Sequence, residues 1–390
     1  MKESLSFPLG DVPFYWRMLD DFGADRKGIP DLLPFSFSFR PELQLITQFE
    51  NSAVLDWLRR VYREDANVGY LQEGHALSVP YGDEFLRFVD EVLDRHQLSP
   101  KSAMEIGCGG VYLLKRLRDR GFAVCGIDPS PVSSQQARNA GLELIADFYP
   151  SPGLSRRADL LFHHNVLEHV ADPVEFLRAH HANLNPGGQV IVAVPDCSEA
   201  IERGDVSMML HEHLVYFDEA SLANTFIAAG FEVLDVGRSR FGGVLFGAAR
   251  MPSVASAVTP LPENPGTAKF DRFRKLADRA IQNFSSWMES HRAAGRSVGF
   301  YVPLRAIPYL AACGHLSGYR FFDDDPGIHS KYFAGIRVQV EDFKDLSANP
   351  VDHLLVASLA FGEKIATKVK NRFEDNVRTS VLRDILPPDT

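Results

Sequence analysis

Two histidines, a glutamate and two aromatic residues lie within the eight positions of LHEHLVYF, from Leu210 to Phe217. Three interpretations of this segment stay open. An H-x-H spacing would put His211 and His213 on one side of an extended strand, where they could ligate a metal, but no third ligand of fitting spacing is evident. The histidines could instead satisfy buried backbone groups and cap the helix that begins near Asp218. In the third interpretation a histidine accepts a proton and a carboxylate stabilises the imidazolium, since free imidazole has a pKa of about 6.5.

A β-loop-α-β unit is predicted for residues 103–130, upstream of that segment. A short apolar strand leads into Gly107, Gly109 and Gly110, a stretch of helical periodicity follows, and a second strand ends at Asp128. Glycines let a ligand approach the backbone closely, and a carboxylate at the second strand tip can accept hydrogen bonds from a ribose diol. The unit is therefore predicted to bind a nucleoside, with an ordinary tight turn as the alternative.

The kind of nucleoside is narrowed by Tyr112, which stands where the dinucleotide fingerprint G-x-G-x-x-G has its third glycine. A pyrophosphate needs the close helix packing that this glycine permits, whereas S-adenosylmethionine has no phosphate. Its carboxylate and ammonium groups can use the glycine loop and a nearby acid such as Glu105.

Polar residues also follow the later strands. Asp147 and Phe148 suit an adenine, because a carboxylate can accept from the exocyclic amine and an aromatic ring can cover the base. A helix cap is the alternative for this pair. Asn165 follows a strand over residues 158–163. Strands that alternate with helices at this spacing predict a doubly wound, mainly parallel sheet, in which the carboxyl ends of the strands meet at one edge.

The composition excludes several classes of protein. A net charge of −10 and a pI near 5.7 argue against a general nucleic-acid binder. The four cysteines are scattered and never form C-x-x-C, so neither a disulfide framework nor a zinc knuckle is expected. The N-terminal residues lack the apolar core of a signal peptide, and no stretch approaches the roughly 20 apolar residues that cross a membrane. We expect a cytoplasmic protein that contacts no membrane.

Composition shifts divide the 390 residues into four consecutive segments. Residues 1–82 are a leader or lid region, in which Tyr70 lies on a loop that either covers a substrate or packs on the next domain. Residues 83–250 are the α/β domain described above, and residues 251–296 are a linker followed by an amphipathic helix. Residues 297–390 resume the strand and helix alternation as a smaller α/β domain. Arg305 lies at its first strand-to-helix turn, where a cation can meet a phosphate, although this domain could also be a structural lobe.

Several motifs, taken in chain order, resemble known families. EIGCGG, GIDPS, ADFY, HHNVLEHV and LNPGGQVIVAVP are similar to motifs of the class I S-adenosylmethionine-dependent methyltransferases. LHEHLVYF, the FGG at residues 241–243 and the C-terminal run GFYVPLRAIPYL…FFDDDPGIHSKYFAGIRV look like the sugar-nucleotide C-methyltransferases, which methylate a carbon of a deoxy-keto-sugar. The resemblance implies a Rossmann-like methyltransferase sheet, S-adenosylmethionine as donor, S-adenosylhomocysteine as product and a nucleotide-sugar held partly by the C-terminal domain.

The resemblance also implies roles for individual residues. His213 would be the general base that generates an enolate, Glu212 its partner, and Tyr216 a hydrogen-bond donor to the enolate oxygen. The donor would be bound by the residues at the strand tips: Glu105, Gly107, Gly109, Asp128, Asp147, Phe148 and Asn165. The acceptor would be bound by Tyr70, His211, Arg305 and, in a matching Lys-Tyr-x-x-Gly segment, Lys331.

The chain departs from the family pattern at several positions. The family usually begins with a cysteine-rich zinc-binding module, but this chain has no cysteine before Cys108, so no metal is expected. Val111 ends a loop that usually reads Asn-Asp-Gly, and Leu210 replaces a tyrosine. The alternatives are therefore an O- or N-methyltransferase of a related metabolite and a donor-binding protein without turnover. A nicotinamide-dependent oxidoreductase is disfavoured by Tyr112 and by the lack of a Tyr-x-x-x-Lys pair near the strand tips.

Overall fold

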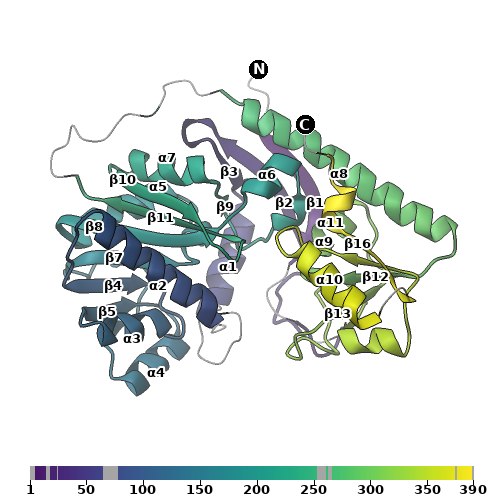
Figure 1. The fold of residues 1–390 in the computed structure, drawn as a ribbon, viewed down its shortest axis with the longest axis horizontal. Helices are drawn as coiled ribbons and strands as arrows, with labels where there is room; N and C mark the ends of the chain where they lie inside the picture. The colour runs from purple at the N-terminus through teal and green to yellow at the C-terminus, as the bar shows by residue number, and fades with distance from the viewer. Residues whose placement is uncertain are drawn as a thin grey trace. The chain divides into compact units, whose positions relative to one another are not determined.

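The computed structural model describes residues 5–14, 18–23, 25–64, 78–252, 261, 266–373 and 376–388. The chain forms two compact units, each built from segments that are not contiguous in sequence (Figure 1). Unit 1 consists of Met1–Phe39, Cys197–His211 and Thr267–Thr390, and unit 2 of Arg40–Asp196 and Glu212–Gly266. The sequence suggested consecutive segments, whereas the chain enters and leaves unit 1 more than once.

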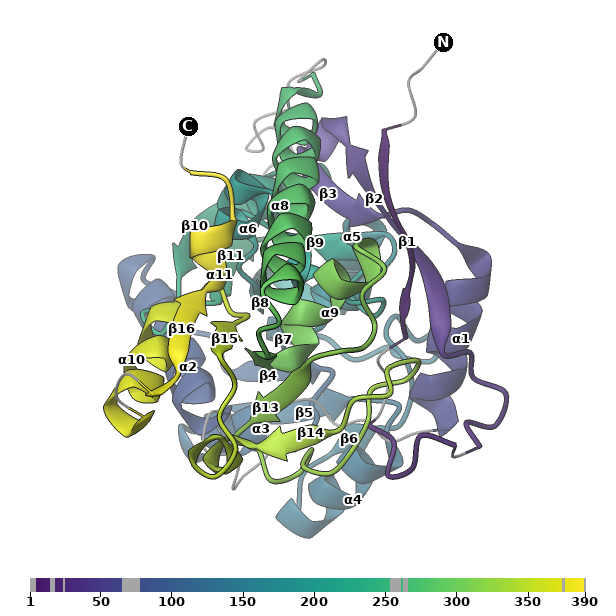
Figure 2. The same ribbon diagram turned by 90° about the vertical axis from the view of Figure 1, so that its right-hand side faces the viewer.

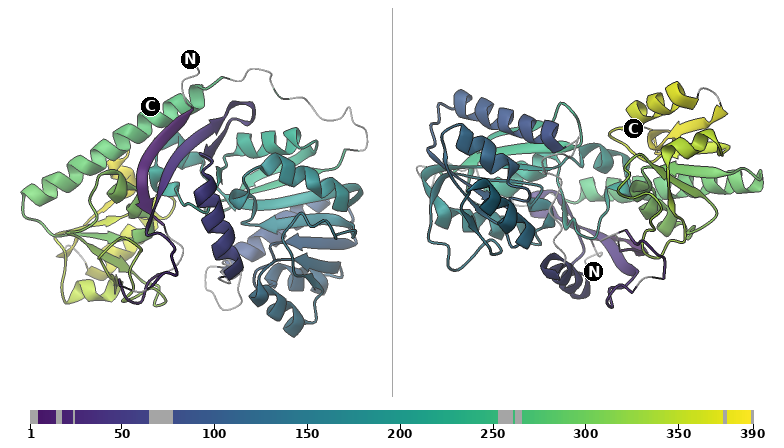
Figure 3. Two further views of the ribbon diagram at one scale, coloured as in Figure 1. Left: turned by 180° about the vertical axis from the view of Figure 1, so that it is seen from behind. Right: turned by 90° about the horizontal axis from the view of Figure 1, so that it is seen from below.

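Unit 2 contains a seven-stranded sheet in the order β10-β11-β8-β7-β4-β5-β6. Figure 3 shows the same ribbon from behind and from below. The strands are β4 (Ser102–Ile106), β5 (Ala123–Ile127), β6 (Leu144–Ile145), β7 (Ala158–His164), β8 (Leu184–Pro195), β10 (Glu232–Arg238) and β11 (Val244–Arg250). Strands β4 to β8 pair in parallel, and β11 and β10 add an antiparallel pair beyond β8. The predicted doubly wound, mainly parallel sheet is thereby confirmed.

Helices cover both faces of this sheet because its central strands are apolar on both sides. Leu160 and Phe162 of β7 pack with α2 (Ser78–Arg95), α3 (Tyr112–Asp119) and α4 (Pro131–Ala140) in one core cluster. Leu161, on the opposite face of the same strand, joins α5 (Pro173–Asn183) and α7 (Glu219–Ala228) in another. Alternate residues of a strand point to opposite faces, so a continuous apolar run is what a sheet with two covered faces requires.

The remaining elements of unit 2 flank its sheet. The 3-10 turn η1 (Pro41–Leu43) leads to β3 (Leu45–Gln48), which pairs antiparallel with β9 (Val215–Tyr216), and α1 (Ser52–Glu64) follows. A second 3-10 turn, η2 (Leu167–His169), comes directly after β7. Both α1 and β3 lie in the region that the sequence analysis treated only as a leader or lid.

Unit 1 holds a parallel five-stranded sheet in the order β14-β13-β12-β15-β16. Its strands are β12 (Val298–Tyr301), β13 (Arg320–Asp323), β14 (Val340–Asp342), β15 (His353–Val356) and β16 (Arg378–Val381). Its helices are α6 (Ser198–Arg203), α8 (Ala268–Ala293), α9 (Pro303–Ala312), α10 (Gly362–Phe373) and α11 (Leu382–Ile385), with 3-10 turns η3 (Val206–Met208) and η5 (Phe343–Ser347). Figure 2 shows the long α8 of this unit in green. The predicted second α/β region is present.

The N-terminal part of unit 1 is an antiparallel strand pair. Strand β1 (Ser6–Pro13) pairs with β2 (Leu32–Arg40), and a register shift between Pro8 and Gly10 marks a bulge. The sequence analysis did not predict these strands. Within the described ranges, no helix is both long and apolar enough to cross a membrane.

Candidate functional site

The loop between β4 and α3 contains residues with positive φ, a backbone conformation that glycine adopts easily. Gly107 has a φ of +73° and Gly109 a φ of +48°, and Val111 adopts +56°, which is uncommon for a β-branched residue. A Cβ on Gly107 would lie 2.6 Å from Cγ2 of Val166, whereas no described atom lies within 4 Å of the Cβ position of Gly109. The backbone at Gly109 therefore faces open space, as close approach by a ligand requires.

Asp128, directly after β5, is tied to that loop. Its Oδ2 accepts a hydrogen bond from the Gly109 backbone N–H at 3.0 Å, and its Oδ1 accepts one from the Ser130 N–H at 2.8 Å. Burial raises the pKa of this carboxyl, and the backbone N–H groups oppose the shift. Each carboxylate oxygen can accept more than one hydrogen bond, so Asp128 can fix the loop and still receive ribose hydroxyls.

Glu105 lies inside the protein. Glu105 is only 1% exposed, and its Oε2 has no hydrogen-bond partner in the described part of the chain. Burial, and then the charge of Asp128, raise the pKa of Glu105 well above its usual value, against a hydrogen bond from the Leu114 backbone. That bond reaches the first turn of α3, so the geometry favours a role in holding the loop. Direct contact of Glu105 with a donor stays a prediction.

The tips of β6 and β7 supply groups that fit an adenosine. Asp147 is exposed and accepts hydrogen bonds from the Phe148 N–H at 2.8 Å and the Ser151 hydroxyl at 2.7 Å. The Ser151 bond, then the Phe148 bond, lowers the pKa of this carboxyl, which favours the acceptor form. The Phe148 ring is 42% exposed. Asn165 has a φ of +55°, and its buried Oδ1 has no partner among the described residues. An exposed ring and an unpaired acceptor at neighbouring strand tips suit a nucleoside.

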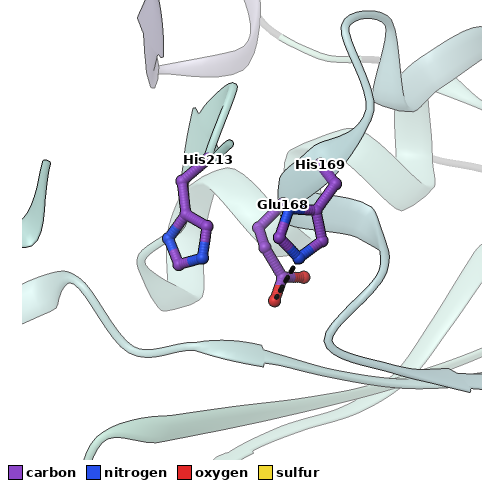
Figure 4. Close-up of side chains that lie close together, drawn as sticks. All are labelled: Glu168, His169 and His213. Atoms are coloured by element: carbon purple, nitrogen blue, oxygen red, sulfur yellow. Dashed lines mark ion pairs between the residues drawn. The ribbon is translucent and has the colours of Figure 1, made fainter. Parts of the chain in front are cut away.

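A second group of side chains gathers where η2 and the segment before β9 meet. Glu168, His169 and His213 each offer one nitrogen or oxygen atom, and these atoms lie within 4.8 Å of one another (Figure 4). We call these three residues the Glu168 cluster. His169 Nε2 lies 3.7 Å from Glu168 Oε1, and the rings of His169 and His213 have centroids 5.1 Å apart at an angle of 73°. Because Val166 contacts Gly107, the segment bearing this cluster begins beside the glycine loop.

The cluster has a defined hydrogen-bonding pattern. His169 Nδ1 lies 2.8 Å from the carbonyl oxygen of Glu212. A carbonyl can only accept, so Nδ1 carries the hydrogen and Nε2 of the neutral ring holds the lone pair. Glu168 is 1% exposed, and its Oε2 has no partner among the described atoms. Burial raises the pKa of Glu168 to about 7, while the nearby His169 opposes this and Glu212 adds to it.

The two histidines of the H-x-H pair do not act together. Residues 211 and 212 form a turn, not an extended strand. His211 belongs to unit 1, where it is 3% exposed, its Nε2 lies 3.1 Å from the Leu33 carbonyl oxygen, and its ring contacts Phe14 and Phe35. Burial lowers its pKa to about 4. The two histidines therefore do not share a strand face, and the position of His211 is that of a core histidine.

Tyr216 and Glu212 contribute differently from expectation. The Tyr216 side chain lies on β9, opposite Ile46, and is completely buried. Its hydroxyl is therefore enclosed by protein in this structure, so a contact with an enolate oxygen stays a prediction. Glu212 contributes its backbone carbonyl to His169, in addition to any role of its carboxylate.

The predicted acceptor residues of unit 1 are held by protein contacts. Arg305, in the first turn of α9, donates from Nη1 to the Ser207 carbonyl oxygen at 3.0 Å. Ser207 and Tyr309 in turn donate to the buried Asp205. Lys331 Nζ lies 3.7 Å from an oxygen of Asp20. Tyr70 falls outside the described residues.

Part of the chain matches a known protein family. Residues 76–236 match the family model described as a methyltransferase domain. This part of the chain is a methyltransferase domain. The cofactor expected of it is S-adenosylmethionine, and the glycine loop, Asp128, Asp147 and Asn165 offer the polar groups and the open space that such a donor needs.

Curated relatives are similar to the chain over the same region. It is 32% identical to a ubiquinone biosynthesis O-methyltransferase of Marinobacter nauticus over 118 residues, which is 28% of this chain and 48% of that protein. It is 36% identical to the protein of that name in Ruegeria pomeroyi over 92 residues, 22% of this chain and 37% of that one. The chain thus spans less than half the length of these relatives.

Solved structures of methyltransferases are also similar. The N-methyltransferase NodS of Bradyrhizobium japonicum, with S-adenosylhomocysteine, is 15% identical with a TM-score of 0.37 over 51% of this chain and 98% of its own. The Burkholderia thailandensis 1,6-didemethyltoxoflavin-N1-methyltransferase is 19% identical with a TM-score of 0.38 over 56% of this chain and 95% of its own.

Glu168 and His169 are the site candidates that the sequence analysis missed. They lie in HHNVLEHV, one of the motifs that resemble those of the methyltransferases. A general signal was available, because polar residues directly after a buried strand lie at the edge where ligands bind in open α/β sheets.

Proposed function

We propose that this chain is an S-adenosylmethionine-dependent methyltransferase of a small-molecule acceptor. The observation that carries the proposal is the arrangement of the methyltransferase domain. Its open glycine loop, bonded to Asp128, begins beside the segment that holds the Glu168 cluster. A donor site and a group of proton acceptors thus lie on neighbouring segments of one domain.

Different residues of the chain would bind the donor and take the proton from the acceptor. When bound, the donor supplies a methyl group on a sulfonium, which passes to a nucleophile in one displacement. Asp128 and the glycine loop hold the nucleoside, while Asp147 and Phe148 bind the adenine. His213 takes the proton from the acceptor, so that the electron pair left behind can attack the methyl carbon. Alignment of the nucleophile with the methyl group supplies much of the remaining acceleration.

The proposed acceptor is a nucleotide-linked deoxysugar with a keto group, methylated on the carbon beside that group. The C–H bonds beside a carbonyl are acidic enough for a positioned histidine to act on them. Support comes from the resemblance of LHEHLVYF and the C-terminal run to sugar-nucleotide C-methyltransferases, and from the second α/β unit. Arg305 and Lys331 are the proposed contacts of that unit with the nucleotide. Residues of the Asp205 network hold Arg305, so its guanidinium is positioned before any ligand arrives.

Methylation of an oxygen is the second candidate. It is favoured by the similarity to ubiquinone biosynthesis O-methyltransferases over the donor-binding region. The same histidine would then take a proton from a hydroxyl group. The two candidates share the donor site and differ in the acceptor.

A methylation screen tests the proposal. The full chain is incubated with S-adenosylmethionine and, separately, with nucleotide-linked deoxy-keto-sugars and with hydroxylated aromatic compounds. Mass spectrometry then detects the gain of one methyl group, and NMR assigns it to carbon or oxygen. We expect a C-methylated nucleotide-sugar. A product methylated only on oxygen would establish the second candidate, and donor binding without any product would contradict both.

A further inference from the structure

The start of helix α2 is bonded to two other parts of unit 2. The hydroxyl of Tyr112, the first residue of α3, donates to Asp83 Oδ1 at 2.6 Å. The next residue, Glu84, accepts hydrogen bonds from the Arg240 backbone N–H at 2.7 Å and from the Ser239 hydroxyl. Glu84 is only 4% exposed, and a buried carboxylate is costly unless its oxygens are bonded in this way. The first turn of α2 therefore links the helix after the glycine loop to the turn between β10 and β11.

That turn carries a half-exposed aromatic ring. The Tyr81 hydroxyl donates to the Gly242 carbonyl oxygen at 3.1 Å, and the rings of Tyr81 and Phe241 have centroids 5.7 Å apart at an angle of 71°. Phe241 nevertheless remains 50% exposed. We call Tyr81 and Phe241 the aromatic pair. Two rings at a steep angle form a corner, in which a flat molecule can stack on one ring and meet the edge of the other.

The aromatic pair lies at the carboxyl edge of the seven-stranded sheet. Val244, the first residue of β11, pairs with Pro195 at the end of β8. Asn165, directly after β7, donates its backbone N–H to the Ala193 carbonyl oxygen of the same strand β8 at 2.9 Å. Two strand spacings, about 10 Å, thus separate the tip of β7 from the start of β11. Ligands of open α/β sheets bind outside this edge.

Unpaired polar atoms lie at the same edge, under the same helix. The ring of Phe85, one helical turn after Tyr81, contacts the ring of His164 at the end of β7, with centroids 5.5 Å apart. Both ring nitrogens of His164 and Oδ1 of Asn165 are buried and have no hydrogen-bond partner among the described residues. Most buried polar atoms in proteins are paired, so unpaired ones indicate where a ligand or water supplies the partner. The aromatic pair therefore adjoins a part of the edge that is suited to a ligand.

We propose that the aromatic pair binds the acceptor, through a flat unsaturated ring that stacks on Phe241. This inference rests on the proposed function and deepens it, because it assigns a contact that selects the acceptor. Both candidate acceptors offer such a ring, either in the base of a nucleotide-linked sugar or in a hydroxylated aromatic compound. Stacking removes apolar surface of both rings from water, which phosphate groups and sugar hydroxyls cannot do. Glu84 is a positioning residue, since it holds the turn that bears Phe241.

Two probes distinguish the possible sources of the ring. The full chain, saturated with S-adenosylhomocysteine, is titrated by calorimetry with thymidine diphosphate and, separately, with catechol. We expect one probe to bind, and Phe241→Ala to weaken its binding by about fivefold or more. Phe49→Ala removes another half-exposed ring of unit 2 and is the matched control, which should leave the affinity unchanged. Neither variant should change the affinity for S-adenosylhomocysteine.

The same titrations can overturn the inference. Failure of both probes to bind, or equal affinity in the parent and in Phe241→Ala, would mean that the aromatic pair does not contact the acceptor. Light scattering gives a second check, because self-association that Phe241→Ala abolishes would assign the ring to a contact between copies of the chain. Failure to bind S-adenosylhomocysteine would instead contradict the proposed function.

Turnover supplies a readout that a merely structural role would not move. With the acceptor found in the screen, Phe241→Ala should raise the KM for the acceptor by about fivefold or more and leave kcat within about twofold, because the ring takes no part in proton or methyl transfer. Phe241→Trp keeps a flat ring and should restore the KM. Glu84→Gln should raise the same KM by a smaller factor and add nothing to Phe241→Ala, since it acts through that ring. Normal product formation with an unchanged KM in Phe241→Ala would overturn this inference and leave the proposed function standing.

Discussion

His169 Nδ1 and the carbonyl oxygen of Glu212 lie 2.8 Å apart, and this contact joins two segments that are 43 residues apart in the chain. One segment follows the tip of β7, beside the glycine loop. The other carries His213. The contact therefore joins the segment that carries His213, the proposed general base, to the segment beside the glycine loop within a single unit.

Asp128 is predicted to anchor the donor. Asp128→Ala should weaken the affinity for S-adenosylmethionine by about 1–3 kcal/mol, since hydrogen bonds to a charged group are lost. Part of this loss would come from the loop, because Gly109 and Ser130 both donate to the carboxylate. Calorimetry measures the affinity, and Asp119→Ala, an exposed acid at the end of α3, is the control. Unchanged affinity in Asp128→Ala would remove this residue from the site.

The two loop glycines should differ in their sensitivity to alanine. Gly109→Ala adds only the cost of a left-handed φ, about 1 kcal/mol, because its Cβ would meet no described atom. Gly107→Ala adds the same cost and a 2.6 Å contact with Val166, for which overpacking typically costs a further 1–3 kcal/mol or so. Thermal unfolding of both variants should therefore show a larger loss for Gly107→Ala. Equal losses would mean that Val166 moves aside freely.

Two histidines that are two positions apart should give opposite phenotypes. His213→Gln is expected to abolish turnover and leave both the melting temperature and the donor affinity nearly unchanged. His211→Gln should lower stability, because its ring fills a buried position against Phe14 and Phe35. Melting curves and single-turnover rates separate the two effects. A near-normal rate in His213→Gln would remove it from its proposed role.

Glu168 is predicted to reduce stability at alkaline pH. Its pKa is raised from 4.5 to about 7 in the folded chain, so stability from this group is fully present below about pH 4.5 and is lost as the pH rises through 7. At about 1.4 kcal/mol per pH unit, the loss reaches about 3 kcal/mol above pH 7. Glu168→Gln cannot ionise, so its melting temperature relative to the parent should be higher at pH 8 than at pH 5. A pH-independent difference would show that the carboxyl ionises normally.

The elements whose formation depends on residues close together in the sequence could be predicted from the sequence. Apolar runs, glycines and strand tips identified β4, β5 and β7, and Asp128, Asp147 and Asn165 lie after strands as expected. These signals are local because side-chain direction repeats along a strand or helix.

The cluster could not be predicted, because it depends on contacts between distant segments. His169 and Glu212 are 43 residues apart, and no sequence period links them. The H-x-H interpretation required an extended backbone at residue 211, but a turn there sends His211 and His213 to different surroundings. The grouping of residues 197–211 with the rest of unit 1 could not be predicted for the same reason. Segments that are far apart in the sequence come together there only in the folded chain.

Donor binding is the central claim, and calorimetric titration of the full chain tests it most directly. S-adenosylmethionine and S-adenosylhomocysteine are titrated in turn, with NAD as the control for a dinucleotide. The account predicts micromolar affinity for the first two ligands, one site per chain and no heat with NAD. Binding of NAD, or no binding of either adenosyl ligand, would contradict it.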